Sequence, residues 1–398
     1  MNVQDIPACF EVFSPGRAEI CGNHTDHEGG HVVAAALDAG IKARVVLHNS
    51  QDLQKTVLIK SEGFENISLN LDEPGAFEPR ESEYGTTISL VRGMLALMKN
   101  VCRPYSGFTV TCESSIPAGG GLSSSAAFEL MIGVILNHAF AEKPLEPSEL
   151  AILAREVEEW YFGKPCGLMD QLAIAHGGFV AMDFADAAHP QVESLNIDFG
   201  SMGLAHCLID THSDHSACTE EYNLVPREMQ DVAQMFGKTR LCEVTKSEVM
   251  AQAQRICREL GERAFVRALH FYREEALTQK RIDALTKQDA QAFCTLTRES
   301  NASSAMLLQN VWVSGKYQPA MAALAHAQDL LDSYALQNTS CLRGAARIHG
   351  GGFGGSIQAF VPIQHQEEFK QAMDSFLGEG SCNVFGLGMP GARVTVKD

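Results

Sequence analysis

The sequence predicts an α+β fold in two lobes, and three observations carry that prediction. The chain has 398 residues, which is more than one hydrophobic core usually organises. Its first half mixes strand-like and helical segments, residues 226–334 are mostly helical in period, and strand-like segments return after Gly344. Ala187-Ala-His-Pro190 loosens the chain near its middle, so we divide it into domains 1–195 and 196–398.

The individual elements follow from local residue patterns. Residues 41–48 and 108–112 are rich in β-branched or alternating residues and predict strands. Residues 126–141 are apolar nearly all round, which predicts a buried helix, and Pro147 opens another helix with one apolar stripe. In the second half we expect a strand over 356–362, a helix over 366–377 and a strand over 392–396.

The composition excludes several classes of protein. Hydrophobic residues make up 45% and charged residues 20%, as in an ordinary globular enzyme. No apolar run approaches the roughly 20 residues that span a bilayer, and the first residues carry no secretion signal, so we expect a cytoplasmic protein without a membrane partner. The 12 cysteines form no Cys-x-x-Cys, which argues against structural zinc and for reduced thiols. A net charge of −18 disfavours nucleic acid but does not exclude a nucleotide.

The segment Pro117-Ala-Gly-Gly-Gly-Leu-Ser-Ser-Ser-Ala-Ala127 has the chemistry of a phosphate site. Its glycines hold a turn open, and its serines can cap the helix that follows. Backbone N–H groups and the positive end of the helix dipole then point to one place. A plain loop that caps a helix is the alternative reading of this segment alone.

A second glycine segment, Gly350-Gly-Gly-Phe-Gly-Gly355, formally matches Gly-x-Gly-x-x-Gly. A dinucleotide-binding turn must open a helix, whereas a strand-like stretch follows here. A protein-kinase loop is also excluded, because no His-Arg-Asp follows it. We expect a turn that lets backbone approach a ligand closely, as the second wall of a nucleotide site.

The segment Gly22-Asn-His-Thr-Asp-His-Glu-Gly-Gly-His31 gathers polar side chains. His24, His27 and His31, with Asp26, could ligate a transition metal. Their spacing lies in a turn-rich stretch rather than on a helix face, so recognition of sugar hydroxyls fits better. A surface loop remains the alternative.

Two carboxylates complete the set of candidates. Asp170 is flanked by apolar residues, and a buried carboxylate needs a partner, for which Arg17 is the obvious candidate. The pair is either a structural salt bridge or a base with its charge stabiliser. Glu158 lies at the flank of its helix, where most glutamates are solvated but where a Mg²⁺ ligand is also suitably placed.

Together these segments resemble one family. Residues 14–26 resemble the opening signature of galactokinases, and residues 116–127 resemble the phosphate-binding motif of the wider GHMP small-molecule kinases. Residues 165–170 and 349–355 match the later motifs of that superfamily, in its order. The resemblance implies a two-lobed fold with a ribosomal-protein-S5-like N-terminal lobe, a C-terminal α/β lobe and the active site between them.

The resemblance also implies residue roles. Asp170 would accept the proton of the anomeric hydroxyl, or only orient that hydroxyl, and Arg17 would neutralise charge on the transferring phosphoryl group and lower the pKa of Asp170. Phosphoryl transfer asks mainly for positioning and cations, which agrees with these roles. The implied ATP contacts are Gly119, Gly120, Gly121, Leu122, Ser123, Ser124, Ser125, Gly351 and Gly352; the implied Mg²⁺ ligands are Ser125 and Glu158; the implied sugar contacts are Asn23, His24, Asp26, Gly167, Asp170 and Tyr222.

The chain departs from galactokinases at two positions. It has Asn23 where they usually carry Glu, and His27 where they usually carry Tyr. That glutamate accepts a hydrogen bond from the C6 hydroxyl, and a carboxylate at C6 would be repelled by Glu but tolerated by Asn. We therefore expect an ATP-dependent galactose 1-kinase, with a galacturonate or arabinose 1-kinase as the alternative.

Two further classes stay open. A catalytically silent sensor of sugar and ATP is disfavoured by the intact Arg17, Ser125 and Asp170. A kinase of a non-sugar alcohol is disfavoured by the cluster of hydroxyl partners around His24. We expect the protein to be a monomer.

Overall fold

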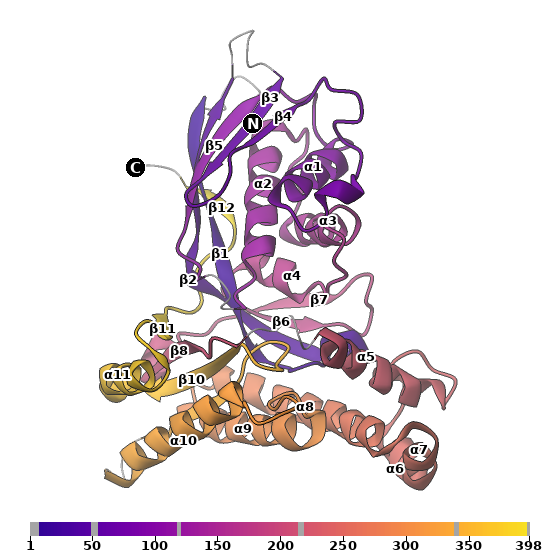
Figure 1. Ribbon diagram of the computed structural model, residues 1–398, viewed down its shortest axis with the longest axis vertical. Coiled ribbons are helices and arrows are strands. Elements are labelled where there is room, and N and C mark those ends of the chain that lie inside the picture. Colours follow the sequence, from indigo (N-terminus) through magenta and orange to yellow (C-terminus); the bar gives the residue numbers. More distant parts are fainter. Residues whose placement is uncertain (1–7, 49–54, 118–120, 214–218, 338–341, 396–398) are drawn as a thin grey trace.

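The computed structural model describes residues 8–48, 55–117, 121–213, 219–337 and 342–395 (Figure 1). In this part of the chain two sheets lie in different regions of the molecule, and helices cover both. No helix among these residues is both long enough and apolar enough to cross a bilayer.

The first sheet contains eight of the described strands. Their order is β12-β1-β2-β5-β3-β4, with β6 beside β2 and β7 beside β6. β3 and β5 run parallel, and the other pairs run antiparallel. The bounds are β1 Cys9–Cys21, β2 His31–Leu47, β3 Thr56–Ser61, β4 Ile67–Asn70, β5 Phe108–Ser114, β6 Phe179–Asp183, β7 Gln191–Leu195 and β12 Arg393–Thr395.

α1, α2, α3 and α4 lie on the same side of this sheet (Figure 1), and α2 and α4 contact its strands. α2 contacts β1 and β2 on one side and α1, α3 and α4 on the others. This enclosure explains why α2 is apolar nearly all round, as predicted. The bounds are α1 Thr87–Met98, α2 Ser124–Phe140, α3 Pro147–Trp160 and α4 Met169–His176.

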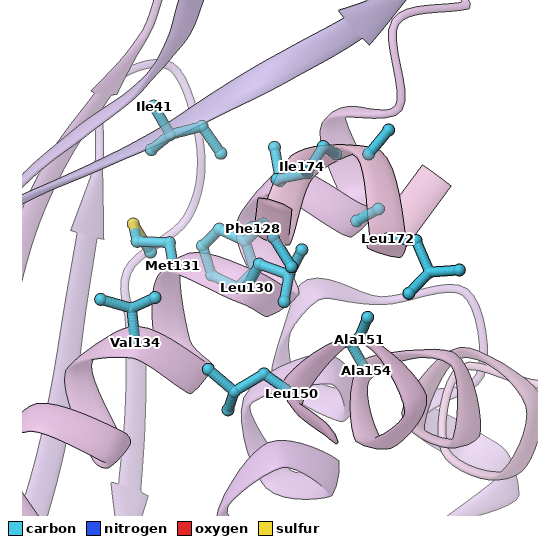
Figure 2. Close-up of a cluster of buried hydrophobic side chains, with 14 of the residues drawn as sticks. Ile41, Phe128, Leu130, Met131, Val134, Leu150, Ala151, Ala154, Leu172 and Ile174 are labelled. Atoms are coloured by element: carbon cyan, nitrogen blue, oxygen red, sulfur yellow. The ribbon is translucent and has the colours of Figure 1, made fainter. Parts of the chain in front are cut away.

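Figure 2 shows the core around α2. Leu130 of α2 lies among side chains that include Ile41 of β2, Leu150 of α3 and Ile174 of α4. All four residues are at most 5% exposed. Burying a side chain of this size contributes about 1.5–3 kcal/mol, so this core fixes the position of the first turn of α2, where the site begins.

The second sheet is antiparallel, in the order β11-β8-β10-β9. α10 and α11 contact β10, α9 contacts β9, and α8 contacts β2 of the first sheet. The bounds are β8 Leu204–Asp210, β9 Ala345–Ile348, β10 Ser356–Pro362, β11 Cys382–Phe385, α5 Thr219–Gln234, α6 Lys246–Ala251, α7 Ala253–Leu260, α8 Glu262–Thr286, α9 Ala290–Ser303, α10 Pro319–Gln337 and α11 Gln366–Leu377.

Single helical turns lie between these elements. They are η2 Asp26–Glu28, η4 Glu81–Glu83, η5 Gly200–Met202, η7 Leu241–Glu243, η8 Ser304–Leu308 and η9 Ile363–His365, of which η8 is a π-helical turn.

Most predicted elements are confirmed. The strand over 356–362 and the helix over 366–377 have the predicted bounds, and the strand predicted over 41–48 is the end of the longer β2. The helical region begins earlier than predicted, because α5 starts at Thr219 and contains Pro226.

The chain passes from the first sheet to the second between β7 and β8. The predicted domain boundary at 195/196 lies in this connection and stays a prediction. β12 nevertheless pairs with β1, so the end of the described chain returns to the first sheet.

Candidate active site

Arg17 and Asp170 form the centre of the site. β1 supplies Arg17, and the first turn of α4 supplies Asp170. Arg17 Nε donates to Asp170 Oδ1 at 2.7 Å, as the sequence predicted, and a second guanidinium nitrogen donates to the Gly121 carbonyl at 2.7 Å. The guanidinium thus joins the carboxylate to the glycine-serine segment.

Asp170 is held in its ionised form. Burial opposes ionisation, but the charge of Arg17 and hydrogen bonds from Arg17 and Ser123 outweigh it, so the pKa of Asp170 lies below its ordinary value. Its side chain is 31% exposed, so a ligand can still reach it.

The glycine-serine segment is described from Gly121 onward, and Gly119 and Gly120 lie outside the described residues. Gly121 and Ser123 have φ of 67° and 58°, and α2 begins at Ser124. The predicted serine cap is wrong for Ser123, whose hydroxyl donates to Asp170 Oδ2 instead. Since Ser123 does not cap the helix, it leaves the first amides of α2 to other partners.

A second carboxylate cluster lies beside this turn. The Ser125 hydroxyl donates to Glu158 Oε1 at 3.3 Å, and Gln171 Nε2 donates to Glu158 Oε2 at 2.8 Å. The same Gln171 nitrogen lies 3.5 Å from Glu129 Oε2. Burial first, and then the neighbouring Glu158, raise the pKa of Glu129 well above its ordinary value. The two predicted metal ligands, Ser125 and Glu158, are therefore adjacent.

His24 joins the opening signature to the late glycine segment. Its Nε2 lies 2.9 Å from the Gly351 carbonyl, and its Nδ1 lies 3.3 Å from His27 Nε2. Burial lowers the pKa of His24 to about 3, so the ring is neutral at physiological pH. Because Nε2 must then donate to the carbonyl, Nδ1 accepts from His27.

Three other predicted sugar contacts lie close to this ring. Tyr222, in α5, stacks at a tilt with its centroid 5.6 Å from that of His24. A Cβ at Gly351 would lie 2.3 Å from the Tyr222 ring, and one at Gly167 would lie 2.8 Å from Asp26 Oδ2. Only glycine permits these approaches, which bring Asp26 and Tyr222 beside backbone.

Asn23 makes a different set of contacts from those expected. It is fully buried, its Nδ2 donates to the Gly350 carbonyl at 2.7 Å, and its Oδ1 accepts from Ser304 and Asn310. Protein groups thus occupy both ends of the amide. A direct contact between Asn23 and a sugar stays a prediction and would require one of these bonds to open.

The late glycine segment packs against the same region. Gly352 has φ of 78°, and a Cβ there would lie 2.3 Å from the Asn310 carbonyl oxygen. Gly351 and Gly352 therefore lie with the signature residues and Tyr222, and their contact with a nucleotide stays a prediction.

The histidines of the signature do not converge. His31 Nδ1 lies 2.5 Å from Glu275 Oε1 and its Nε2 lies 3.6 Å from Asp183, whereas His24 and His27 contact each other. Within the described residues there is no cluster of three His, Cys, Asp or Glu side chains that could hold a metal.

Known proteins are similar to this chain over most of its length. The family model of the GHMP kinases N terminal domain matches residues 89–178, and that of the galactokinase galactose-binding signature matches residues 3–45. A galactokinase of Actinobacillus pleuropneumoniae serotype 3 is 27% identical over 92% of this chain and 88% of its own. A galactokinase of Limosilactobacillus reuteri is 28% identical over 90% of this chain and 87% of its own.

Solved structures agree over nearly the whole chain. Lactococcus lactis galactokinase, solved in complex with galactose, has a TM-score of 0.77 at 25% identity and covers 97% of this chain and 95% of its own. Residues 89–178 thus resemble the GHMP kinases, and the chain as a whole resembles galactokinases. L. major mevalonate kinase, at 14% identity and a TM-score of 0.64, shares the fold of this chain.

Several residues around the site were not predicted from the sequence. Gln171 follows Asp170 directly, and Glu129 lies one helical turn after Ser125, so spacing could have indicated both. Glu19 lies two residues after Arg17 on the same strand, where period two places it on the same face. Asn310 carried no local signal, because only the folded chain brings it to Asn23.

Two hollows of the molecule lie away from the candidate site. A hollow of about 870 Å³ is lined by residues of β1, β2, β3 and β5, and another of about 630 Å³ lies at the end of α2. None of the predicted site residues lines either of them.

Proposed function

We propose that the protein is an ATP-dependent kinase that transfers a phosphoryl group to the anomeric hydroxyl of galactose, giving galactose 1-phosphate and ADP. One observation carries the proposal: the Asp170 carboxylate is bound by both Arg17 and Ser123, beside the signature residues His24, Asp26 and Tyr222. Galactokinase relatives over most of the chain support the choice of substrate.

Asp170 would orient the attacking hydroxyl. Its lowered pKa keeps it ionised, so it can accept a hydrogen bond from the anomeric hydroxyl. The same low pKa makes it a weak base, so the proton would move to Asp170 only as the new oxygen–phosphorus bond forms. Arg17 would stabilise the negative charge on the transferring group, because its guanidinium already lies between Asp170 and Gly121.

ATP would bind with its phosphates at the start of α2. Backbone N–H groups from Gly121 to Ser125 and the positive end of the helix dipole suit that charge. The predicted contacts of ATP with Gly119, Gly120, Gly351 and Gly352 are part of this proposal.

Mg²⁺ would be held by Ser125 and Glu158, with phosphate and water completing the coordination. Two neighbouring oxygen ligands from protein fit this ion, which usually keeps several waters. When bound, it would neutralise charge on the phosphates. Gln171 would orient Glu158 through the 2.8 Å hydrogen bond to its second oxygen. We expect these reactions to take place in the cytoplasm, in a monomeric enzyme.

Release of ADP tests the proposal. The protein is supplied with MgATP and, separately, galactose, galacturonate, arabinose, galactosamine or glucose. We expect turnover on galactose and little on galacturonate. A preference for galacturonate or arabinose would contradict galactose as the substrate but agree with the activity of a sugar kinase. Binding of sugar and ATP without release of ADP would indicate a sensor rather than an enzyme.

A further inference from the structure

Glu19 is a buried carboxylate on the same strand face as Arg17. Arg17 and Glu19 pair in regular register with Ala36 and Ala34 of β2, so their side chains point to the same side of the sheet. On that side Arg17 reaches Asp170 and the phosphate loop. Glu19 therefore lies on the face of β1 that carries the candidate site.

Only one oxygen of the Glu19 carboxylate is bound. Arg347 donates to Oε1 at 2.8 Å, and Asn23 Nδ2 lies 3.5 Å from the same atom. No group among the described residues hydrogen-bonds to Oε2, although the residue is only 4% exposed. Oε2 is not among the fully buried side-chain oxygens that lack a partner, so it keeps some exposure, and a ligand hydroxyl that reaches it can donate a hydrogen bond to it.

The surroundings of Glu19 are those of the predicted sugar contacts. Although 48% of Tyr222 is exposed, burial of part of the ring and the nearby carboxylates of Asp26, Asp170 and Glu19 raise its pKa to about 12. The Glu19 backbone N–H donates to His349, directly before the glycine segment that contacts Tyr222.

Asn23 has no free group with which to take the place of the expected glutamate. Its amide oxygen is bound by Ser304 and Asn310, and its amide nitrogen donates to Gly350. The carboxylate that the resemblance expects at position 23 is thus missing, while Glu19 places one next to the Asn23 side chain.

We propose that Glu19 binds the sugar, accepting a hydrogen bond from one of its hydroxyls at Oε2 in the place of the glutamate expected at position 23. This inference rests on the proposed function and adds a residue that determines specificity. It also adds a third carboxylate to Asp26 and Asp170, so that three carboxylates face the two cations Arg17 and Arg347. Such a pocket repels an anionic sugar and accepts a neutral one.

The test pairs a protein change with a ligand change. Binding of galactose and of its 2-, 3-, 4- and 6-deoxy forms is measured by calorimetry for the wild type and for Glu19→Gln. In the wild type, we expect one deoxy sugar to bind about 10- to 100-fold more weakly, because a hydrogen bond to a charged group is lost. In Glu19→Gln that penalty should shrink to a few-fold, and galacturonate should bind better relative to galactose.

Glu274→Gln is the matched control. Glu274 is a fully buried carboxylate of the same charged region, 3.7 Å from Arg281 and bound by Ser300. Glu274 Oε1 also accepts from the Asn23 backbone N–H at 3.4 Å, a bond that the Gln oxygen can still accept. Since Glu274 makes no hydrogen bond to Glu19, the pattern of deoxy penalties should stay that of the wild type. If Glu19→Gln does not fold, Glu19→Asp keeps the charge but withdraws the oxygens, and the same penalty should fall.

The outcomes separate the two proposals. An unchanged pattern of penalties in the Glu19 variants, or the same change in Glu274→Gln, would overturn the role of Glu19. Binding of galactose without its phosphorylation would overturn only the proposed function, because calorimetry still measures the Glu19 effect. Tighter binding of galacturonate than of galactose by the wild type would overturn both.

Discussion

At Asp170, burial and charge act on the carboxyl group in opposite directions, and charge prevails. Arg17 and Ser123 together lower its pKa, so the residue that faces the anomeric hydroxyl in the proposed reaction is an anion before the sugar arrives. Its affinity for a proton is correspondingly small. Orientation of the hydroxyl and stabilisation of the phosphoryl charge must therefore supply most of the rate.

Asp170→Asn should keep the shape of the side chain and remove its charge. We expect turnover of galactose to fall by roughly 10²–10⁴-fold, the usual size of general-base and positioning effects. ADP release under saturating MgATP measures it, and thermal unfolding checks the fold. Asp186→Asn, an exposed carboxylate outside the site, is the control and should keep full activity. Activity of Asp170→Asn within threefold of wild type would contradict the assignment.

The pH dependence of kcat/KM should show the low pKa of Asp170. Its value lies below the ordinary 3.8, so activity that depends on the anion is present above that value and is lost only as pH falls through the lowered pKa. Arg17→Met should move this acid limb to higher pH, because the charge that lowers the pKa is gone. If the acid limb does not move in Arg17→Met, then Arg17 does not lower the pKa of the group that this limb reports.

Residue roles could be read from the sequence only where a motif fixed them. The Arg17–Asp170 contact was predicted because both residues lie in recognisable segments and each needs a partner. The contacts of Asn23 were not, because Ser304 and Asn310 lie more than 280 positions away along the chain. The predicted cap by Ser123 was wrong for the same reason. Its hydroxyl binds Asp170, which is distant in the sequence, instead of a nearby backbone group of its own helix.

At the scale of elements, α8 holds the signature segment in place. His270 of α8 lies 2.9 Å from the Asn23 carbonyl, and Glu275 binds both the backbone and the ring of His31. These contacts connect the start of β2 to the helical region. They explain how a turn-rich segment with three glycines can present His24 and Asp26 in fixed positions.

The His31–Glu275 contact should make stability depend on pH. The hydrogen bond to Glu275, which outweighs burial, raises the pKa of His31 above 6.5. The contact therefore stabilises the fold fully at a pH below the pKa of His31 in the unfolded chain. This stabilisation is lost as the pH rises through the pKa of His31 in the folded protein. Both side chains are partly exposed, so we expect less than about 1 kcal/mol.

Urea unfolding of wild type and His31→Gln between pH 5 and 9 measures this difference. The stability gap between the two should narrow as pH rises. His189→Gln, with its exposed ring, should show no such gap. A gap that widens with rising pH would contradict the assignment.

The bounds of helices and strands were predicted better than the elements with which they pair. The pattern of 356–362 and 366–377 is local, so their bounds were correct. Alternation in 392–396 indicated a strand but carries no information about which strand it joins. We placed it in the second domain, yet β12 pairs with β1 of the first sheet.

At the scale of the whole molecule, the end of the described chain ties the two regions together. After β11 in the second sheet, Gly388 donates to Ala36 of β2, and Ala392 donates to Ile174 of α4. β12 then completes the edge of the first sheet. This path crosses the end of α4, so it supports the helix whose first turn carries Asp170.

Gly177→Ala should disrupt this crossing. Gly177 has φ of 70°, and a Cβ there would lie 1.9 Å from the Gly391 backbone nitrogen. We expect a loss of more than about 2 kcal/mol in the free energy of unfolding. Gly178→Ala is the matched control, since its φ is 65° but nothing lies within 4 Å of the added atom, and it should cost only about 1–2 kcal/mol. Free energies of unfolding in urea measure both losses. If the two variants lost the same free energy, the close contact between Gly177 and Gly391 would not account for the effect of Gly177→Ala.

Identification of the product tests the central claim most directly. Purified protein is incubated with MgATP and galactose, and the phosphorylated sugar is examined by ³¹P NMR with coupling to the sugar protons. We expect one sugar phosphate, coupled to the anomeric proton, and far less of it over the same time with Asp170→Asn. Phosphate on another carbon, or no sugar phosphate while galactose binds, would contradict it.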